Sequence, residues 1–117
     1  MNKNFNRINR IEQLLQRELA KIISYEVKPP SFVTISHAIV SKDLSYAKVY
    51  FTVFGSKVEE TQNLLDTAAK RYRNVLSQSM NLRKMPKLKF IYDASIEYAN
   101  RLSKLIDDVN KDIVNEN

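Results

Sequence analysis

Two β-rich segments separated by only five residues constrain the fold of this chain more than any other feature. Residues 32–40 (FVTISHAIV) and 46–54 (YAKVYFTVF) are rich in β-branched and aromatic residues, and the connection 41–45 (SKDLS) is short and polar. Strands joined by so short a connection pair as antiparallel neighbours. The sequence therefore predicts a β-hairpin, whose second strand ends at Gly55.

Alternation along the hairpin predicts which side chains share a face. In the first strand it places Val33, Ile35 and Ile39 on one side, and His37 on that same side. On the second strand, an aromatic side chain is expected on the opposite, partly solvated face of the sheet. The candidates for this face are Tyr46, Tyr50 or Phe54.

Apolar residues at helical spacing flank the hairpin on both sides. A helix is predicted over about 6–25, ending before Pro29-Pro30, and helical spacing returns over 57–80. Periodicity leaves open whether 57–80 is one helix of about 24 residues or two in close succession. After Pro86, alternation over 88–92 predicts a third strand, and Ser95 is a candidate N-cap of a last helix.

These elements predict one α+β domain with the order α-β-β-α(α)-β-α. A length of 117 residues fits a single domain, and the chain contains no linker, internal repeat or low-complexity stretch. A three-stranded sheet cannot cover both of its faces, so the helices are expected to pack on one of them. We assign residues 1–112 to the domain and 113–117 to a polar C-terminal tail.

Composition excludes several classes of functional site. The chain has no Cys, one His (His37) and one Gly (Gly55). It therefore cannot build a disulfide, a thiolate or multi-histidine metal site, a cysteine nucleophile or a glycine-rich phosphate loop. No apolar run approaches the ~20 residues of a membrane span, and charged residues interrupt the first helix at every turn. We therefore expect a cytoplasmic protein with no metal or cofactor.

Positive charge is concentrated in one window of the sequence. The net charge is +6, and seven basic residues lie between Asp66 and Asp93 with no acidic residue among them. A solvated helix face usually mixes charges of both signs, so this window favours a surface for a polyanion such as nucleic acid. The seven residues are Lys70, Arg71, Arg73, Arg83, Lys84, Lys87 and Lys89.

Other polar residues are better explained by structure than by catalysis. His37 has no acidic partner or nucleophile beside it in the sequence, and Asp107 and Asp108 point about 100° apart on a helix. Glu59-Glu60 occupies the first turn of a helix, where negative charge offsets the helix dipole. The aromatic residues of 46–54 loosely resemble the base-stacking strand of an RNA-recognition motif, but that motif's glycines are missing and sheet packing explains them better.

Two motifs are distinctive in their spacing. One is S-K-D-L-x-x-A-K-V-Y over 41–50, and the other is L-R-x-x-P-x-L-x-F-x-Y-D over 82–93. Together with Arg10-Ile11, Leu19-Ala20 and Val33-Thr34-Ile35, they make the chain closely resemble the ribosome-binding factor A family of bacteria. The resemblance runs from about Arg7 to Leu105, which is nearly the whole chain.

The resemblance implies a KH-like (type II) fold in which two helices meet at an interhelical kink. In this family an Ala-x-Gly kink replaces the usual Gly-x-x-Gly loop, in agreement with the single glycine of this chain. The matching positions are Ala68-Ala69-Lys70, with lysine where the family has glycine. This departure bears on the sharpness of the kink, because a non-glycine residue resists left-handed geometry.

The resemblance also implies a function. It is that of a late assembly factor that binds the immature 30S ribosomal subunit and its 16S rRNA and supports processing of the rRNA 5′ end. The family is associated with cold adaptation and has no catalytic activity. We expect the same partners here, an assembly GTPase acting in release, and a monomer. The RNA-binding residues are predicted to be Lys70, Arg71, Arg73, Arg83, Lys84, Lys87 and Lys89, with Arg7 and Arg10 as lesser contributors.

Two other functions stay open at this point. The basic face could belong to a protein-interaction module that docks an acidic protein, in which case excess single-stranded RNA would not displace the partner. The chain could also be a nuclease, although no cluster of metal ligands in the sequence supports that.

Overall fold

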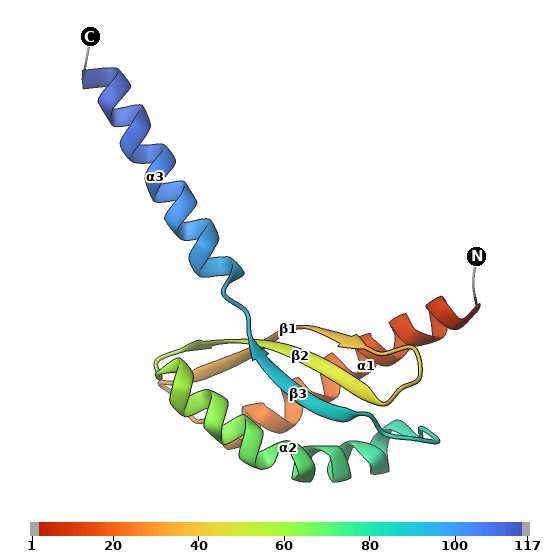
Figure 1. The fold of residues 1–117 in the computed structure, drawn as a ribbon. Coiled ribbons are helices and arrows are strands. Elements are labelled where there is room, and N and C mark those ends of the chain that lie inside the picture. Colours follow the sequence, from red (N-terminus) through yellow and green to blue (C-terminus); the bar gives the residue numbers. More distant parts are fainter. Residues whose placement is uncertain (1–2, 116–117) are drawn as a thin grey trace.

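The order of elements agrees with the α+β fold that the sequence predicts. A computed structural model describes residues 3–115, and Figure 1 shows their arrangement. The elements are α1 (Lys3–Glu26), β1 (Phe32–Val40), β2 (Tyr46–Phe54), α2 (Val58–Met80), β3 (Lys87–Tyr92) and α3 (Ser95–Asn115).

The sheet has the order β1-β2-β3 and is mixed. β1 and β2 pair antiparallel, which confirms the predicted hairpin, whereas β2 and β3 pair parallel. A parallel neighbour needs a crossover connection, and α2 provides it. α1 and α2 cover the same face of the sheet (Figure 1), as expected for a three-stranded sheet with a hydrophobic side.

The hydrophobic core lies between this face and the two helices. α1 packs on β1 and α2 on β3, and the apolar stripes of the two helices form one cluster with the inner side chains of the sheet, including those of the central strand β2. The aromatic rings of Tyr72 and Phe90 meet edge to face with centroids 6.1 Å apart, which joins α2 to β3. The largest fully buried side chains are those of Leu15, Leu19, Ile23, Val49, Phe51, Leu65, Tyr72, Leu76 and Pro86.

A β-bulge in β1 overturns part of the predicted alternation. The pairing register with β2 shifts between Ile35 and His37, so that one extra residue, Ser36, has no partner there. Beyond the bulge the faces are exchanged: Ala38 is buried and Ile39 is 48% exposed. The prediction that Ile39 and His37 share the side of Ile35 is therefore wrong. The side chain of Gln16 in α1 supports the bulge, because its Nε2 donates to the carbonyl oxygens of Ile35 and Ser36 at 3.1 Å each.

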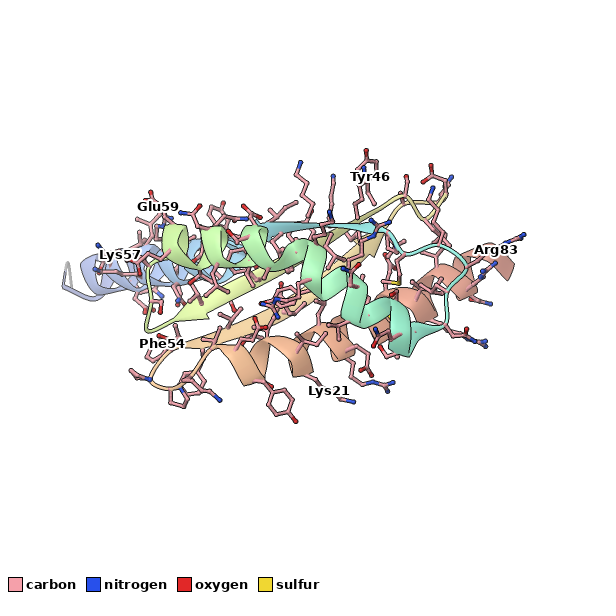
Figure 2. All side chains as sticks on the ribbon, turned by 90° about the horizontal axis from the view of Figure 1, so that it is seen from below. Lys21, Tyr46, Phe54, Lys57, Glu59 and Arg83 are labelled. Atoms are coloured by element: carbon pink, nitrogen blue, oxygen red, sulfur yellow. The ribbon has the colours of Figure 1, made fainter. Side chains whose placement is uncertain are left out.

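α2 is one continuous helix of 23 residues, which decides between the two alternatives that periodicity left open. The expected pair of helices meeting at Ala68-Ala69-Lys70 is not present as two elements, since all three positions are helical. Figure 1 and Figure 2 both show the axis of α2 changing direction about midway along its length. No residue at this bend is left-handed, since Leu44 and Asn81 are the only non-glycine residues with positive φ within 3–115. This agrees with a lysine at position 70, because a non-glycine residue resists left-handed geometry. The helix ends at Asn81, which adopts the left-handed conformation with φ 46°.

α3 departs from the prediction that the helices pack on the sheet. It leaves the end of β3 and points away from the body of the molecule (Figure 1). Its described side chains from 97 to 110 are all exposed, including the apolar ones. At its start, Oδ1 of Asp93 accepts a hydrogen bond from the backbone N–H of Ser95 at 3.0 Å. Ser95 is the first residue of the helix, and the carbonyl oxygen of Ala94 accepts the first helical hydrogen bond, so the N-cap position is Ala94 and not the predicted Ser95. The helix continues to Asn115, past the predicted start of the tail at 113, and residues 116–117 lie outside the described part.

Candidate nucleic-acid interface

The turn of α2 separates three of the predicted cations. Tyr72 points into the core, and successive residues on a helix are rotated by about 100°. Arg71 and Arg73 therefore lie on opposite flanks of the buried stripe, with Arg71 toward α1 and Arg73 toward β3. Lys70 lies on the β3 flank with Arg73, because residues three apart share a face.

A basic groove forms where this flank of α2 faces β3. A cavity of about 280 Å³ is lined by Ala69, Lys70 and Arg73 of α2 and by Lys87 and Leu88 of β3. The groove thus brings together three of the predicted RNA-binding residues, with two apolar side chains beside them. These lining residues include no acidic side chain. The groove suits an extended anionic chain, because its lysines are exposed and its two walls are a helix and a strand.

Arg73 also holds the loop between α2 and β3 in place. Its Nε and one Nη donate to the carbonyl oxygen of Met85 at 3.2 and 2.8 Å, and the side chains of Met85 and Pro86 are buried. Arg83 and Lys84 lie on this anchored loop and are exposed. Figure 2 shows Arg83 projecting at one end of the molecule, with Lys57 at the opposite end of α2. The loop therefore extends the positive charge of the groove toward one end.

Arg71 does not contribute to this groove. Its guanidinium forms an ion pair with Oε1 of Glu26 at the end of α1, and it lies 5.1 Å from the ring centroid of Tyr72. The hydroxyl of Tyr72 donates to Oε2 of the same carboxylate at 2.5 Å. Arg71 thus connects α2 to α1. Its place in the basic window suggested that it shares one surface with Lys70 and Arg73, and this expectation is not met.

The carboxylate of Glu26 is held in its charged form by these contacts. The hydrogen bond from Arg71 is the largest cause that lowers the pKa of Glu26 below its ordinary value of 4.5, and the Tyr72 hydroxyl adds to it against the effect of burial. Burial and the bond to Glu26 in turn raise the pKa of Tyr72.

Glu26→Gln is expected to lower the free energy of unfolding by about 1 kcal/mol at neutral pH, because the charge-assisted bonds at a partly exposed site are lost. Because the pKa of Glu26 is lower in the folded than in the unfolded state, its ionised carboxylate stabilises the folded state above pH 4.5. This stabilisation is lost as the pH falls through the lowered pKa. The difference in the free energy of unfolding between wild type and Glu26→Gln should therefore become smaller below pH 4.5. Urea unfolding at several pH values measures this free energy for both proteins. Glu18→Gln, which removes a pair with exposed Lys21, is the control with little effect at any pH.

The remaining predicted cations lie at two other places. Lys89 is in register with Lys48 of β2 and faces away from the helices. Arg7 and Arg10 are exposed near the start of α1, and a small cavity there is lined by Arg7, Ile8, Ile11, Lys42 and Leu44. The seven basic residues between Asp66 and Asp93 therefore do not form one continuous surface. They are divided between the groove with its adjacent loop, the ion pair of Arg71 with Glu26, and the outward side of the sheet.

Lys42 and Lys48 are two exposed cations that the sequence analysis did not assign to the site. Lys42 belongs to the hairpin connection, where hydrogen bonds from the side chain and backbone of Ser45 and from Ser41 lower the pKa of Asp43 to about 2. Asp43 accepts these bonds within its own turn. Both lysines lie in the S-K-D-L-x-x-A-K-V-Y motif, which was the signal that could have identified them.

His37 has neighbours that the sequence alone did not reveal. It lies on the edge strand β1, its ring stacks on Tyr50 at 4.2 Å, and its Nδ1 is 4.0 Å from Oδ2 of Asp93. Ser36 donates to that same oxygen at 2.9 Å and lies 3.3 Å from Nδ1. A catalytic triad needs the serine and the carboxylate on different ring nitrogens, so this cluster does not have that geometry. Residues 3–115 contain no group of three His, Asp or Glu side chains that could hold a metal ion.

None of the described helices is long and apolar enough to cross a membrane.

Comparisons with known proteins identify relatives over most of the chain. The family model for ribosome-binding factor A matches residues 7–106. A ribosome-binding factor A of Legionella pneumophila (strain Lens) is 50% identical over 113 residues, which cover 94% of this chain and 92% of that protein. The crystal structure of ribosome-binding factor A from Thermus thermophilus is similar with a TM-score of 0.66 and 28% identity, covering 73% of this chain and 94% of that one. Coordinates of the Thermus thermophilus factor fitted into a cryo-EM map of its complex with 30S are similar with a TM-score of 0.64 and 29% identity, covering 73% and 93%.

Proposed function

Because the chain belongs to the ribosome-binding factor A family, we propose that it binds the immature 30S ribosomal subunit through 16S rRNA and supports late maturation, including 5′-end processing. It does so without catalysis. Contacts to phosphates hold one rRNA conformation until maturation is complete, and an assembly GTPase acts in its release. The protein works as a cytoplasmic monomer, with residues 1–112 as its RNA-binding unit.

The observation that carries this proposal is the basic groove of Lys70, Arg73 and Lys87. The groove runs between α2 and β3, and its apolar residues Ala69 and Leu88 suit the faces of nucleotide bases. Lysines act there as point charges for phosphate, while the exposed Arg83 on the adjacent loop can hold a phosphate in bidentate fashion. Such contacts provide affinity and orientation but little sequence specificity.

Sedimentation of the tagged full chain through a gradient of ribosomal particles tests the proposal. We expect the protein to travel with free and immature small subunits and to be absent from translating ribosomes. Excess single-stranded RNA should displace it from these particles. Sedimentation of the protein alone at the top of the gradient would contradict the proposal, and displacement by an acidic peptide but not by RNA would favour the protein-docking alternative.

Binding is expected to weaken steeply with salt, because counterions return to the RNA as the protein dissociates. If about five of the basic residues neutralise phosphates, log K should fall against log salt with a slope of roughly −3.5 to −4.5. The dissociation constant for the small subunit, measured between low and physiological salt, gives the slope. An affinity that does not change with salt would refute binding through this surface.

A further inference from the structure

The outer face of the sheet carries lysines and aromatic rings in adjacent rows. Residues paired across neighbouring strands point to the same side of a sheet, so the register defines these rows. On β2 and β3 the outward pairs are Tyr46 with Lys87, Lys48 with Lys89, and Tyr50 with Ile91. β1 adds His37 opposite Tyr50 and Ile39 opposite Lys48. We call this set the outer sheet face.

The rings of the outer sheet face are presented in a way that suits base stacking. His37 and Tyr50 form a parallel stack with an interplanar angle of 12°. Tyr46, which the alternation of β2 places on the same face as Tyr50, is 57% exposed. Flat aromatic surfaces on a sheet are the features on which single-stranded RNA stacks its bases.

The charges of the outer sheet face suit the phosphates between such bases. Lys48, Lys87 and Lys89 are exposed within its rows, and none of the residues in these rows is acidic. The carboxylate of Asp93 lies beside His37, and it already accepts hydrogen bonds from Ser36 and from the backbone of Ser95. An anionic strand on this face would therefore meet positive charge along the lysine rows.

In Figure 1 this face is the side of the sheet opposite α1 and α2. α3 rises on this same side from the end of β3 and extends away from the sheet. The described helices thus leave the outer sheet face accessible. Lys87 lies at its margin and also lines the basic groove, so the two surfaces meet at the edge strand β3.

We propose that the outer sheet face is a second binding surface for single-stranded RNA, with bases stacked on Tyr46 and on the His37–Tyr50 pair and phosphates held by Lys48 and Lys89. A strand that fills the basic groove can continue over β3 onto this face through Lys87. The biological use of this surface rests on the proposed function, whereas its affinity for RNA can be tested without the ribosome. Stacked rings favour RNA over an acidic protein, because a protein carboxylate has no planar base to place on them.

Binding of the full chain to a fluorescent single-stranded RNA of about ten nucleotides tests the proposal. Tyr46→Ala should weaken binding about 5- to 150-fold, the range that corresponds to loss of one stacked base. Tyr25→Ala is the matched control, since Tyr25 is an exposed tyrosine on α1, at 77%, outside both surfaces. Equal affinities of Tyr46→Ala and wild type would overturn the proposal. A second outcome would also overturn it: an oligoglutamate that binds as tightly as the RNA, with an affinity that Tyr46→Ala does not change. That result would indicate an acidic protein partner.

Photocrosslinking to the same RNA carrying 4-thiouridine locates the contact directly. Crosslinked peptides containing Tyr46, Tyr50 or Lys89 are expected, and crosslinks confined to the 70–73 segment would overturn the proposal. The variant Lys70→Glu tests the outer sheet face independently of the function proposed above, because Lys70 lines the basic groove and is not part of that face. If the outer sheet face binds RNA, its crosslinks persist in this variant even when binding to the small subunit is weakened. Wild type that binds small subunits but gives no crosslink on the outer sheet face would contradict the second surface alone.

Discussion

Lys70→Glu combined with Lys87→Glu is expected to weaken binding to the small ribosomal subunit at least about 100-fold at physiological salt. The two lysines line the basic groove from α2 and from β3. Each reversal removes a proposed contact to phosphate and places a carboxylate against it, so attraction is replaced by repulsion. Both side chains are exposed, and the fold should therefore be retained. Gradient sedimentation and a titration with purified subunits measure the loss.

Lys28→Glu combined with Lys57→Glu is the matched control for net charge. Both residues are exposed at the end of the molecule where Ser31 contacts Gly55 and Ser56, and Figure 2 places Lys57 at the opposite end of α2 from Arg83. This control should bind within a few-fold of wild type. Equal weakening by the two double variants would mean that only overall charge matters, and the basic groove would lose its role.

Phe51→Ala is expected to lower the free energy of unfolding by about 3–5 kcal/mol, enough to unfold a large fraction of a marginal domain. Phe51 is fully buried on the central strand β2, and its ring contacts that of Tyr92 edge to face at 5.8 Å. Truncation removes apolar surface from the core and leaves a cavity that α1, α2 and β3 cannot all collapse to fill. Thermal and urea unfolding measure the change.

Phe54→Ala makes the same chemical change at the end of the same strand, where the ring is 74% exposed. Its effect should stay within about 0.5 kcal/mol, as for other surface substitutions. A large loss at position 54, or a small one at position 51, would contradict the assignment of the buried and exposed positions of β2.

The basic window illustrates how far charge can be interpreted from sequence. Its lack of acidic residues drew attention to the segment that lines the groove. The window does not reveal that Arg71 pairs with Glu26, a residue 45 positions away, or that Arg73 binds the carbonyl of Met85. The positions of both arginines follow from the helical turn around Tyr72, but their partners depend on which elements lie on either flank.

The elements themselves were predictable because each depends on local pattern. Helical and alternating periodicity, with Pro29-Pro30 and Pro86 as breaks, define the order α-β-β-α-β-α. The bulge at Ser36 was not predictable in the same way. It exchanges the faces of His37 and Ile39 and is supported by Gln16 from another element, α1, which alternation along one strand does not report.

The family, the α+β class and the presence of an unusually basic segment were therefore determined by the sequence alone, through motifs and periodicities that act over a few residues. The division of that segment into a groove, an ion pair and an outer sheet face was decided only by the tertiary structure. The physical reason is that a charge acts on whatever lies within a few ångströms of it, and packing of α1, α2 and β3 chooses those neighbours from distant parts of the chain.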